Sequence, residues 1–128
     1  TFGINQAGSM GDADNDVTVE ASSVFRFEPG SDAGSLTLGT GHDFILNPGT
    51  TLTIQNSGSN TVSSTINGAF SGDGNLVFSG TGTLTLGGAA GYTGTTTINA
   101  GTMALGAGVT LPTNTLSVAG TNTGFNVG

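Results

Sequence analysis

The chain has no cysteine, no tryptophan and almost no positive charge. Without cysteine, neither a disulfide framework nor a thiolate metal site is possible. Arg26 is the only cation, and eight Asp and Glu residues bring the formal net charge of the 128-residue chain to −7. Nucleic-acid binding needs a basic surface that neutralises phosphates, so that class of protein is excluded. No apolar run approaches the roughly 20 residues of a membrane span, and we expect no membrane insertion by this segment.

Glycine is abundant, with 24 residues, and threonine, serine and asparagine are also frequent. All four are poor in helix interiors. Apolar side chains fall in pairs separated by one residue, which is the pattern of a short strand with one buried face. The pairs are Val17/Val19, Phe25/Phe27, Leu36/Leu38, Phe44/Leu46, Leu52/Ile54, Leu76/Phe78, Leu84/Leu86, Met103/Leu105, Leu116/Val118 and Phe125/Val127. The chain is therefore predicted to be all-β.

The pattern repeats along the chain about every 20 residues, a period typical of solenoid proteins. Three series keep that step: Phe78, Ile98 and Val118; Leu46, Ile66 and Leu86; Gly68, Gly88, Gly108 and Gly128. In the first half the step is slightly shorter, from Val17 to Leu36 and from Phe25 to Phe44. Such a repeat is typical of a right-handed parallel β-helix, in which like positions of successive coils stack about 4.8 Å apart. We predict a single β-solenoid domain over residues 1–128, with about six coils of roughly 20 residues.

An antiparallel β-sandwich is the competing architecture. It requires tight hairpin turns, for which Asn67-Gly68 and Asp73-Gly74 are suitable sequences. The regular stacking of like residues would then be a coincidence, so the solenoid is favoured.

The stretch from Ile66 to Gly106, INGAFSGDGNLVFSGTGTLTLGGAAGYTGTTTINAGTMALG, carries a recognisable order of motifs. These are SGDGNL at 71–76, GTGTLTL at 80–86, YTG at 92–94 and INAGT at 98–102. In this order and spacing they resemble the autotransporter-associated β-strand repeat of bacterial surface and secreted proteins. The resemblance implies a parallel β-helix on the cell exterior, acting as a stalk or display surface. It implies no catalytic activity.

The acidic residues are concentrated in the first part of the chain, residues 1–43, whereas Asp73 is the only charge in the repeat part, residues 44–128. Asp12, Asp14 and Asp16 stand at alternate positions, and a turn can converge three such carboxylates on calcium. An EF-hand is excluded, because the glycine and glutamate positions of that loop hold Val17 and Ser23. A solvated acidic turn is the simpler interpretation, and a calcium site is the alternative; no other cofactor is expected.

Three further residues are candidates for a site. His42 beside Asp43 is a possible general base, but Gly39-Thr40-Gly41 precedes it, and a surface histidine in a loop is the better interpretation. Arg26, between Phe25 and Phe27, is predicted to face outward and to pair with Glu20, Glu28 or Asp32. Tyr92 is predicted to be the exposed aromatic residue that a glycan-binding groove would need.

Strand-like alternation runs to both ends, with Phe2/Ile4 at the start and Phe125/Val127 at the finish. No polar cap is visible, and an uncapped solenoid end exposes backbone and apolar core. We expect the ends to continue into adjoining repeats of a longer chain or into other copies. The predicted function is a non-catalytic extracellular structural unit of a bacterial surface stalk, adhesin or secreted fibre, with host or neighbouring cell surfaces as further partners. A calcium- or glycan-binding module is the alternative, and a polysaccharide-active enzyme ranks third.

Overall fold

Residues 2–4, 15–28, 36–56, 63–112, 115–120 and 123–127 are described in the computed structural model, the first of these segments by its backbone alone. They form strands β1 to β12 and no helix. Every strand pairing among them is parallel. The predicted all-β parallel solenoid is therefore confirmed. The antiparallel sandwich is wrong, because hairpins pair antiparallel strands.

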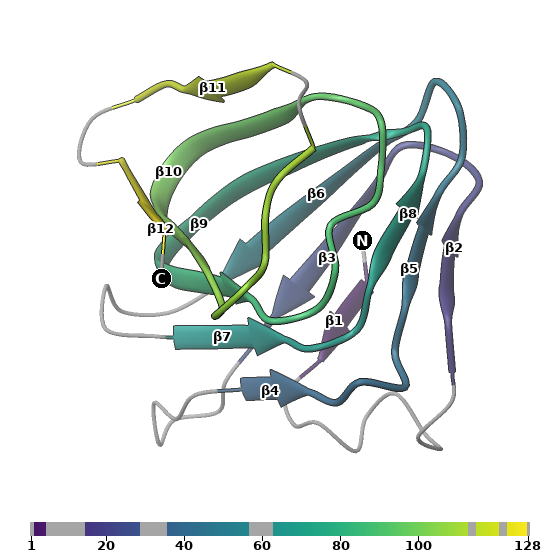
Figure 1. The fold of residues 1–128 in the computed structure, drawn as a ribbon, viewed down its shortest axis with the longest axis horizontal. Coiled ribbons are helices and arrows are strands. Elements are labelled where there is room, and N and C mark those ends of the chain that lie inside the picture. The colour runs from purple at the N-terminus through teal and green to yellow at the C-terminus, as the bar shows by residue number, and fades with distance from the viewer. Residues whose placement is uncertain are drawn as a thin grey trace.

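The chain winds around three faces, on each of which strands of successive coils stack (Figure 1). Face 1 is formed by β1 (Phe2–Ile4), β3 (Ser23–Phe27), β6 (Thr51–Asn56), the first halves of β9 (Asn75–Leu86) and β10 (Thr96–Leu105), and β11 (Leu116–Val118). Face 2 is formed by β4 (Leu36–Leu38), β7 (Ser63–Ile66), the second halves of β9 and β10, and β12 (Gly124–Val127). Face 3 holds β2 (Val17–Val19), β5 (Phe44–Leu46) and β8 (Phe70–Gly72), at the right of Figure 1.

Strands β9 and β10 each turn a corner from face 1 to face 2 without ending. The pairing register between them shifts between Ile98 and Ala100 and again between Ala100 and Thr102, which marks a bulge at the corner. Gly101 lies there with a φ of 75°. A side chain at this position is strained by that φ and meets the carbonyl oxygen of Gly80 at 2.5 Å. Glycine is therefore required for this turn.

Alternate residues of each strand fill a narrow core. In β9 the inward side chains Leu76, Phe78, Leu84 and Leu86 are fully buried, whereas the intervening Val77 and Thr85 are only half-buried. 

Face 3 contributes a column of aromatic rings from Phe44, Phe70 and Tyr92. The rings of Phe44 and Phe70 stack at 5.0 Å between centroids and 10° between planes. Tyr92 meets Phe70 edge-on at 6.3 Å. Because each ring comes from a different coil, the column adds side-chain contacts to the main-chain pairing that joins successive coils.

The predicted apolar ladders are confirmed in the second half of the chain, and the glycine ladder is confirmed for Gly68 and Gly88. Ile98 pairs with Phe78 and Val118, and Ile66 pairs with Leu86. Gly88 also stacks on Gly68, because a Cβ atom on Gly88 would lie 2.1 Å from the carbonyl oxygen of Gly68. Two coils approach too closely at this point for any side chain.

The ladders predicted for the first half are wrong. Val17 pairs with Phe44 rather than with Leu36. Phe25 pairs with Ile54 rather than with Phe44. Leu46 does not join the ladder of Ile66; it pairs with Gly72. Stacking constrains the strands but not the length of the segments between them, so longer connections leave the parallel register intact.

The number of coils differs only slightly from the six predicted. Six strands stack on face 1, whereas strands occupy all three faces in about three turns. The last coil adds β11 and β12 on two of the faces.

Candidate functional site

The last coil, built by β11 and β12, exposes side chains whose counterparts in the preceding coils are buried. On face 1, Phe78 and Ile98 are 0% exposed, but Val118 of the same ladder is 47% exposed. On face 2, Leu105 is 4% exposed and its partner Val127 is 66% exposed. The side chains of the core ladder therefore come to the surface at this end of the solenoid. We call it the C-terminal end, defined by residues 105–112, 116–118 and 124–127.

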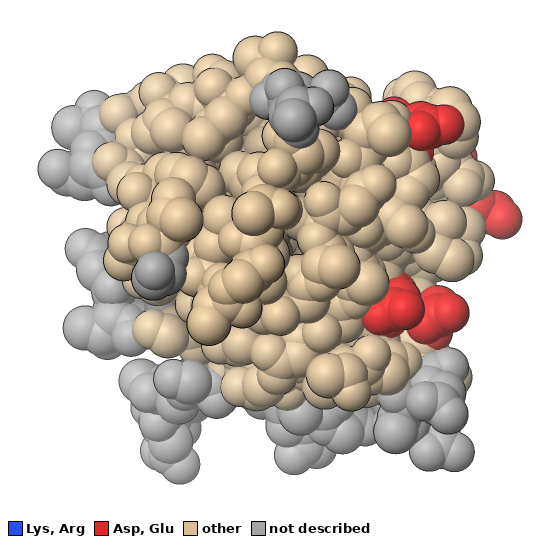
Figure 2. Space-filling view, in the orientation of Figure 1, with Lys and Arg blue, Asp and Glu red and all other residues tan. Residues whose placement is uncertain are grey.

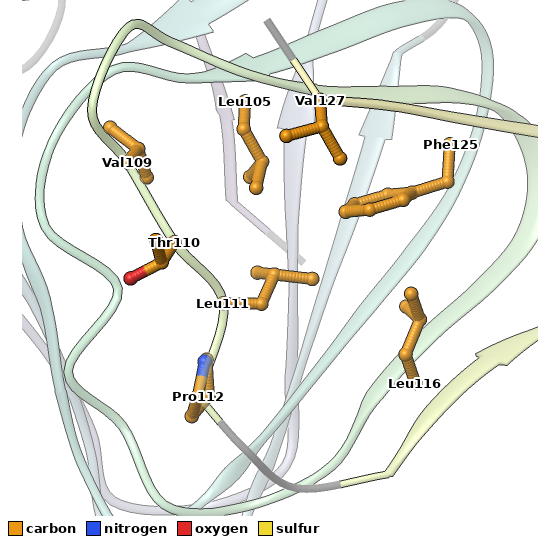
Figure 3. Close-up of a pocket in the computed structure, with 8 residues that line it drawn as sticks. All are labelled: Leu105, Val109, Thr110, Leu111, Pro112, Leu116, Phe125 and Val127. Carbon is orange, nitrogen blue, oxygen red and sulfur yellow. The ribbon is translucent and has the colours of Figure 1, made fainter.

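The C-terminal end carries an open apolar hollow of about 280 Å³. Figure 3 shows the side chains of Leu105, Leu111, Leu116, Phe125 and Val127 pointing toward one another around it. Val109, Thr110 and Pro112 complete the lining. Thr110 is the only one of these residues with a polar side chain, so the hollow is suited to apolar side chains rather than to a polar ligand.

The segment 106–112 forms the face 3 side of this hollow. The amide of Gly106 donates a hydrogen bond to the carbonyl of Leu86, and the amide of Val109 closes a turn onto Gly106. Val109 and Leu111 then pack against the core cluster. These two residues are not among the inward pairs predicted above, although Val109-Thr110-Leu111 alternates in the same way as the strands.

The outer strands of the C-terminal end have one free side. Among the described strands, β11 and β12 are each paired only with β10. A strand at the edge of a sheet presents unpaired N–H and C=O groups and acts as a template for a further strand. The C-terminal end therefore combines two features that favour association with another surface, an apolar hollow and open strand edges.

Charge is distributed as the sequence predicts. Figure 2 shows acidic side chains gathered on the side of the molecule where β2, β5 and β8 lie, and the rest of the described surface in that view is uncharged. No charged side chain follows Asp73 in the sequence. The C-terminal end thus has no charged side chain that would repel a second apolar surface.

The predicted calcium ligands are only partly visible. Asp12 and Asp14 lie outside the described residues, whereas Asp16 Oδ1 accepts a hydrogen bond of 3.2 Å from the amide of Asp43. The described residues contain no group of three His, Cys, Asp or Glu side chains that could hold a metal ion. The calcium site at Asp12, Asp14 and Asp16 stays a prediction.

His42 is buried, so the expectation of a surface histidine is wrong. Its side chain is 6% exposed, and its Nδ1 atom lies 3.1 Å from the carbonyl oxygen of Asn15 in the preceding coil. Its neighbour Asp43 accepts a hydrogen bond of 2.7 Å from the amide of Ala69 in the following coil. Both residues connect coils, because the loop that carries them stacks between two others.

Arg26 faces outward and pairs with Glu28 at 3.5 Å, which confirms the predicted ion pair for that acid. Its guanidinium also donates hydrogen bonds of 3.2 and 3.0 Å to Oε1 of Gln55 in the next coil. The single cation is therefore part of the contact between two coils.

Tyr92 is fully buried, so the prediction of an exposed aromatic for glycan binding is wrong. Its ring continues the column of Phe44 and Phe70, and its hydroxyl forms a hydrogen bond with Oγ1 of the buried Thr96. Burial raises the pKa of the Tyr92 hydroxyl, and the hydrogen bond to Thr96 opposes part of that increase. The alternation Ala90-x-Tyr92, one coil after Phe70-x-Gly72, was the signal for this burial.

Residues 76–105 match the model of the passenger-associated-transport-repeat family. They include β10 and all but the first residue of β9, which are the corner-turning strands of the regular coils. This segment is similar to a passenger-associated transport repeat. The resemblance to autotransporter passenger repeats is thus confirmed for it, and the family implies a secreted or surface-exposed passenger domain.

Comparison with curated proteins and with solved structures gave no significant match for the chain. The described residues include no helix with the length and apolar character that a membrane span requires. The passenger repeat and the parallel solenoid together fit a structural unit of a passenger domain.

Proposed function

We propose that this protein is a non-catalytic structural unit of an extracellular bacterial rod, such as a surface stalk, adhesin or secreted fibre, and that it extends the rod by coil-on-coil stacking at the C-terminal end. The observation that carries the proposal is the exposure of Val118 and Val127, whose ladder partners in the preceding coil are buried. A further coil placed on β11 and β12 would bury both valines and fill the hollow. It would also pair the open strand edges.

A contact between two copies would be stabilised by the same interactions as the contacts between coils inside the molecule. Each coil contact in the molecule combines main-chain hydrogen bonds with burial of apolar side chains, and burial contributes about 25 cal/mol per Å² of apolar surface. The contact at the C-terminal end is continuous with the contact between β10 and its neighbours β11 and β12. A second copy of this chain is the occupant that we propose. Contacts with other cells would use the same main-chain edges and the uncharged outer surface.

Sedimentation velocity over a range of protein concentrations tests the stacking. We expect wild-type protein to form species that grow with concentration, and Val127→Lys to weaken this association at least about tenfold, because a charge would be buried without a partner. Ser117→Lys is the matched control, since Ser117 lies between the two inward residues of β11 and its side chain points out of the ladder. This variant should associate as the wild type does. A wild type that stays monomeric at all concentrations would contradict the proposal.

Ionic strength provides an independent measurement. Apolar burial and main-chain pairing are only weakly screened, so raising the salt from about 20 to about 300 mM should change the association constant less than about threefold. A collapse of association over this range would show that charges hold the copies together, contrary to the proposed mechanism.

A further inference from the structure

We infer that copies of this chain join head to tail: the C-terminal end of one copy pairs with the edges of β1 and β2 of the next, in the register that places Val118 opposite Phe2. The inference rests on the proposed stacking function and specifies its geometry. We call the edges of β1 and β2 the N-terminal end.

Strand direction is the first argument. One continuous ladder runs through Phe2, Phe25, Ile54, Phe78, Ile98 and Val118, with parallel pairing at every step. The sheet of face 1 begins with β1 and finishes with β11. To continue this sheet, the strand added to β11 must run in the same direction and belong to the same face. A second copy provides such a strand when the edge of its β1 approaches β11.

A symmetric contact between two C-terminal ends does not reproduce this arrangement. A twofold axis along the strands keeps them parallel but turns the apolar side of one copy outward. A twofold axis normal to the sheet keeps the apolar sides aligned but makes the strands antiparallel. In either case the two copies do not continue each other's ladders, so the isologous dimer loses the contact that the solenoid uses throughout.

Charge disfavours the third possibility, a contact between two N-terminal ends. Asp16 and Glu20 flank β2, and Glu28 directly follows β3, so two such ends would bring like charges together. The C-terminal end carries no charged side chain. A head-to-tail contact places the acidic end against an uncharged one and avoids this repulsion.

Face 3 supports the same head-to-tail direction independently of face 1. Strand β2 is the outer strand of the sheet β2-β5-β8 and alternates Val17 and Val19. The segment 109–111 of the C-terminal end alternates Val109 and Leu111, which pack against the core as the strands do. A second hollow, of about 160 Å³, lies among residues of β2 and β3 and Leu52. Apolar hollows thus lie at both ends of the described solenoid, and the two ends are able to bury each other.

The contact is heterologous, because different surfaces of the two copies meet. Such contacts leave one free surface at each end of the assembly and generate open filaments unless the rotation happens to close. The expected product is a polar filament in which every copy points in the same direction.

Cysteine cross-linking tests the register, and the absence of native cysteine removes any background. With Val118 opposite Phe2, Ala119 lies opposite Gly3. Neighbouring strands are about 4.8 Å apart, within the range that a disulfide spans. Under mild oxidation, a mixture of the single variants Gly3→Cys and Ala119→Cys should give the mixed dimer as the main linked product. The double variant should give a ladder of linked oligomers that collapses on reduction.

Gly3→Cys mixed with Thr85→Cys is the matched control, because Thr85 lies in the middle of face 2 and should not be linked. Dimers formed by Ala119→Cys alone would overturn the head-to-tail arrangement while leaving self-association intact. Association by sedimentation without any linked product would overturn the register. Protein that neither associates nor links would overturn both this inference and the proposed stacking.

Discussion

Replacing Phe70 by alanine is expected to lower the free energy of unfolding by about 3–5 kcal/mol. Phe70 is 1% exposed and lies at the centre of the aromatic column, stacked on Phe44 and edge-on to Tyr92. Its removal leaves a cavity between two coils, and the coils are held apart by their own main-chain ladders. Because the surrounding coils can move only little into this cavity, the loss of unfolding free energy should fall in the upper part of this range.

Equilibrium unfolding in urea, followed by circular dichroism, measures the effect. Ser71→Ala is the matched control, since Ser71 follows Phe70 in β8 and is exposed. It should change the free energy by no more than about 0.5 kcal/mol. Phe70→Leu keeps part of the side-chain volume, so its loss of unfolding free energy should lie between those of Phe70→Ala and Ser71→Ala. Equal effects of Phe70→Ala and Ser71→Ala would show that the column does not hold the coils together.

Alkaline pH is expected to destabilise the protein through Tyr92 alone. The chain has one tyrosine and neither lysine nor cysteine, so Tyr92 is the only side chain that titrates between about pH 9 and pH 12. The pKa of Tyr92 is raised in the folded state. Above the ordinary tyrosine pKa of about 10 the unfolded chain loses this proton while the folded chain keeps it. The free energy of unfolding therefore keeps its neutral-pH value below about pH 10. It falls as the pH rises toward the pKa of Tyr92 in the folded state, by up to about 1.4 kcal/mol per pH unit.

Tyrosinate absorbance gives the pKa directly, and urea unfolding at several pH values gives the dependence of stability. In Tyr92→Phe the alkaline decrease should disappear, at a cost at neutral pH of about 1 kcal/mol for the lost hydrogen bond. In Thr96→Val the pKa of Tyr92 should rise further, because the hydrogen bond with Thr96 lowers it in the wild type. A tyrosine that titrates at its ordinary pKa in the folded protein would contradict its buried position.

The second half of the fold was predictable because its coils are uniform. Where β9 and β10 follow each other at a constant step, the order of Phe78, Ile98 and Val118 in the sequence is also their order in the ladder. In the first half the same pattern led to wrong partners, since Val17 and Leu36 stand nearly one repeat apart but lie on different faces. Periodicity reveals which residues point inward, but it does not reveal how much chain separates two coils.

The candidate site was predictable in kind and not in detail. Alternation at Phe125 and Val127 indicated a strand with apolar side chains on one side, and both residues line the hollow. The contribution of Val109 and Leu111 to the hollow depends on how segment 106–112 turns back onto the core. 

Burial of the two polar rings was likewise decided by the tertiary structure. The side chains of His42 and Tyr92 are polar enough to predict exposure at the surface, yet both residues are buried. A neighbouring coil supplies the carbonyl of Asn15 to His42, and the hydroxyl of Thr96 satisfies that of Tyr92.

The sequence alone determined the fold class, the alternation of inward and outward side chains, and the charge asymmetry between the two parts of the chain, because these follow from residue type and local spacing. Only the tertiary structure decided which strands stack, how long each coil is and which side chains surround the C-terminal end. Those features depend on contacts between residues far apart in the chain, and the segment between two such residues can take any length that lets the strands meet.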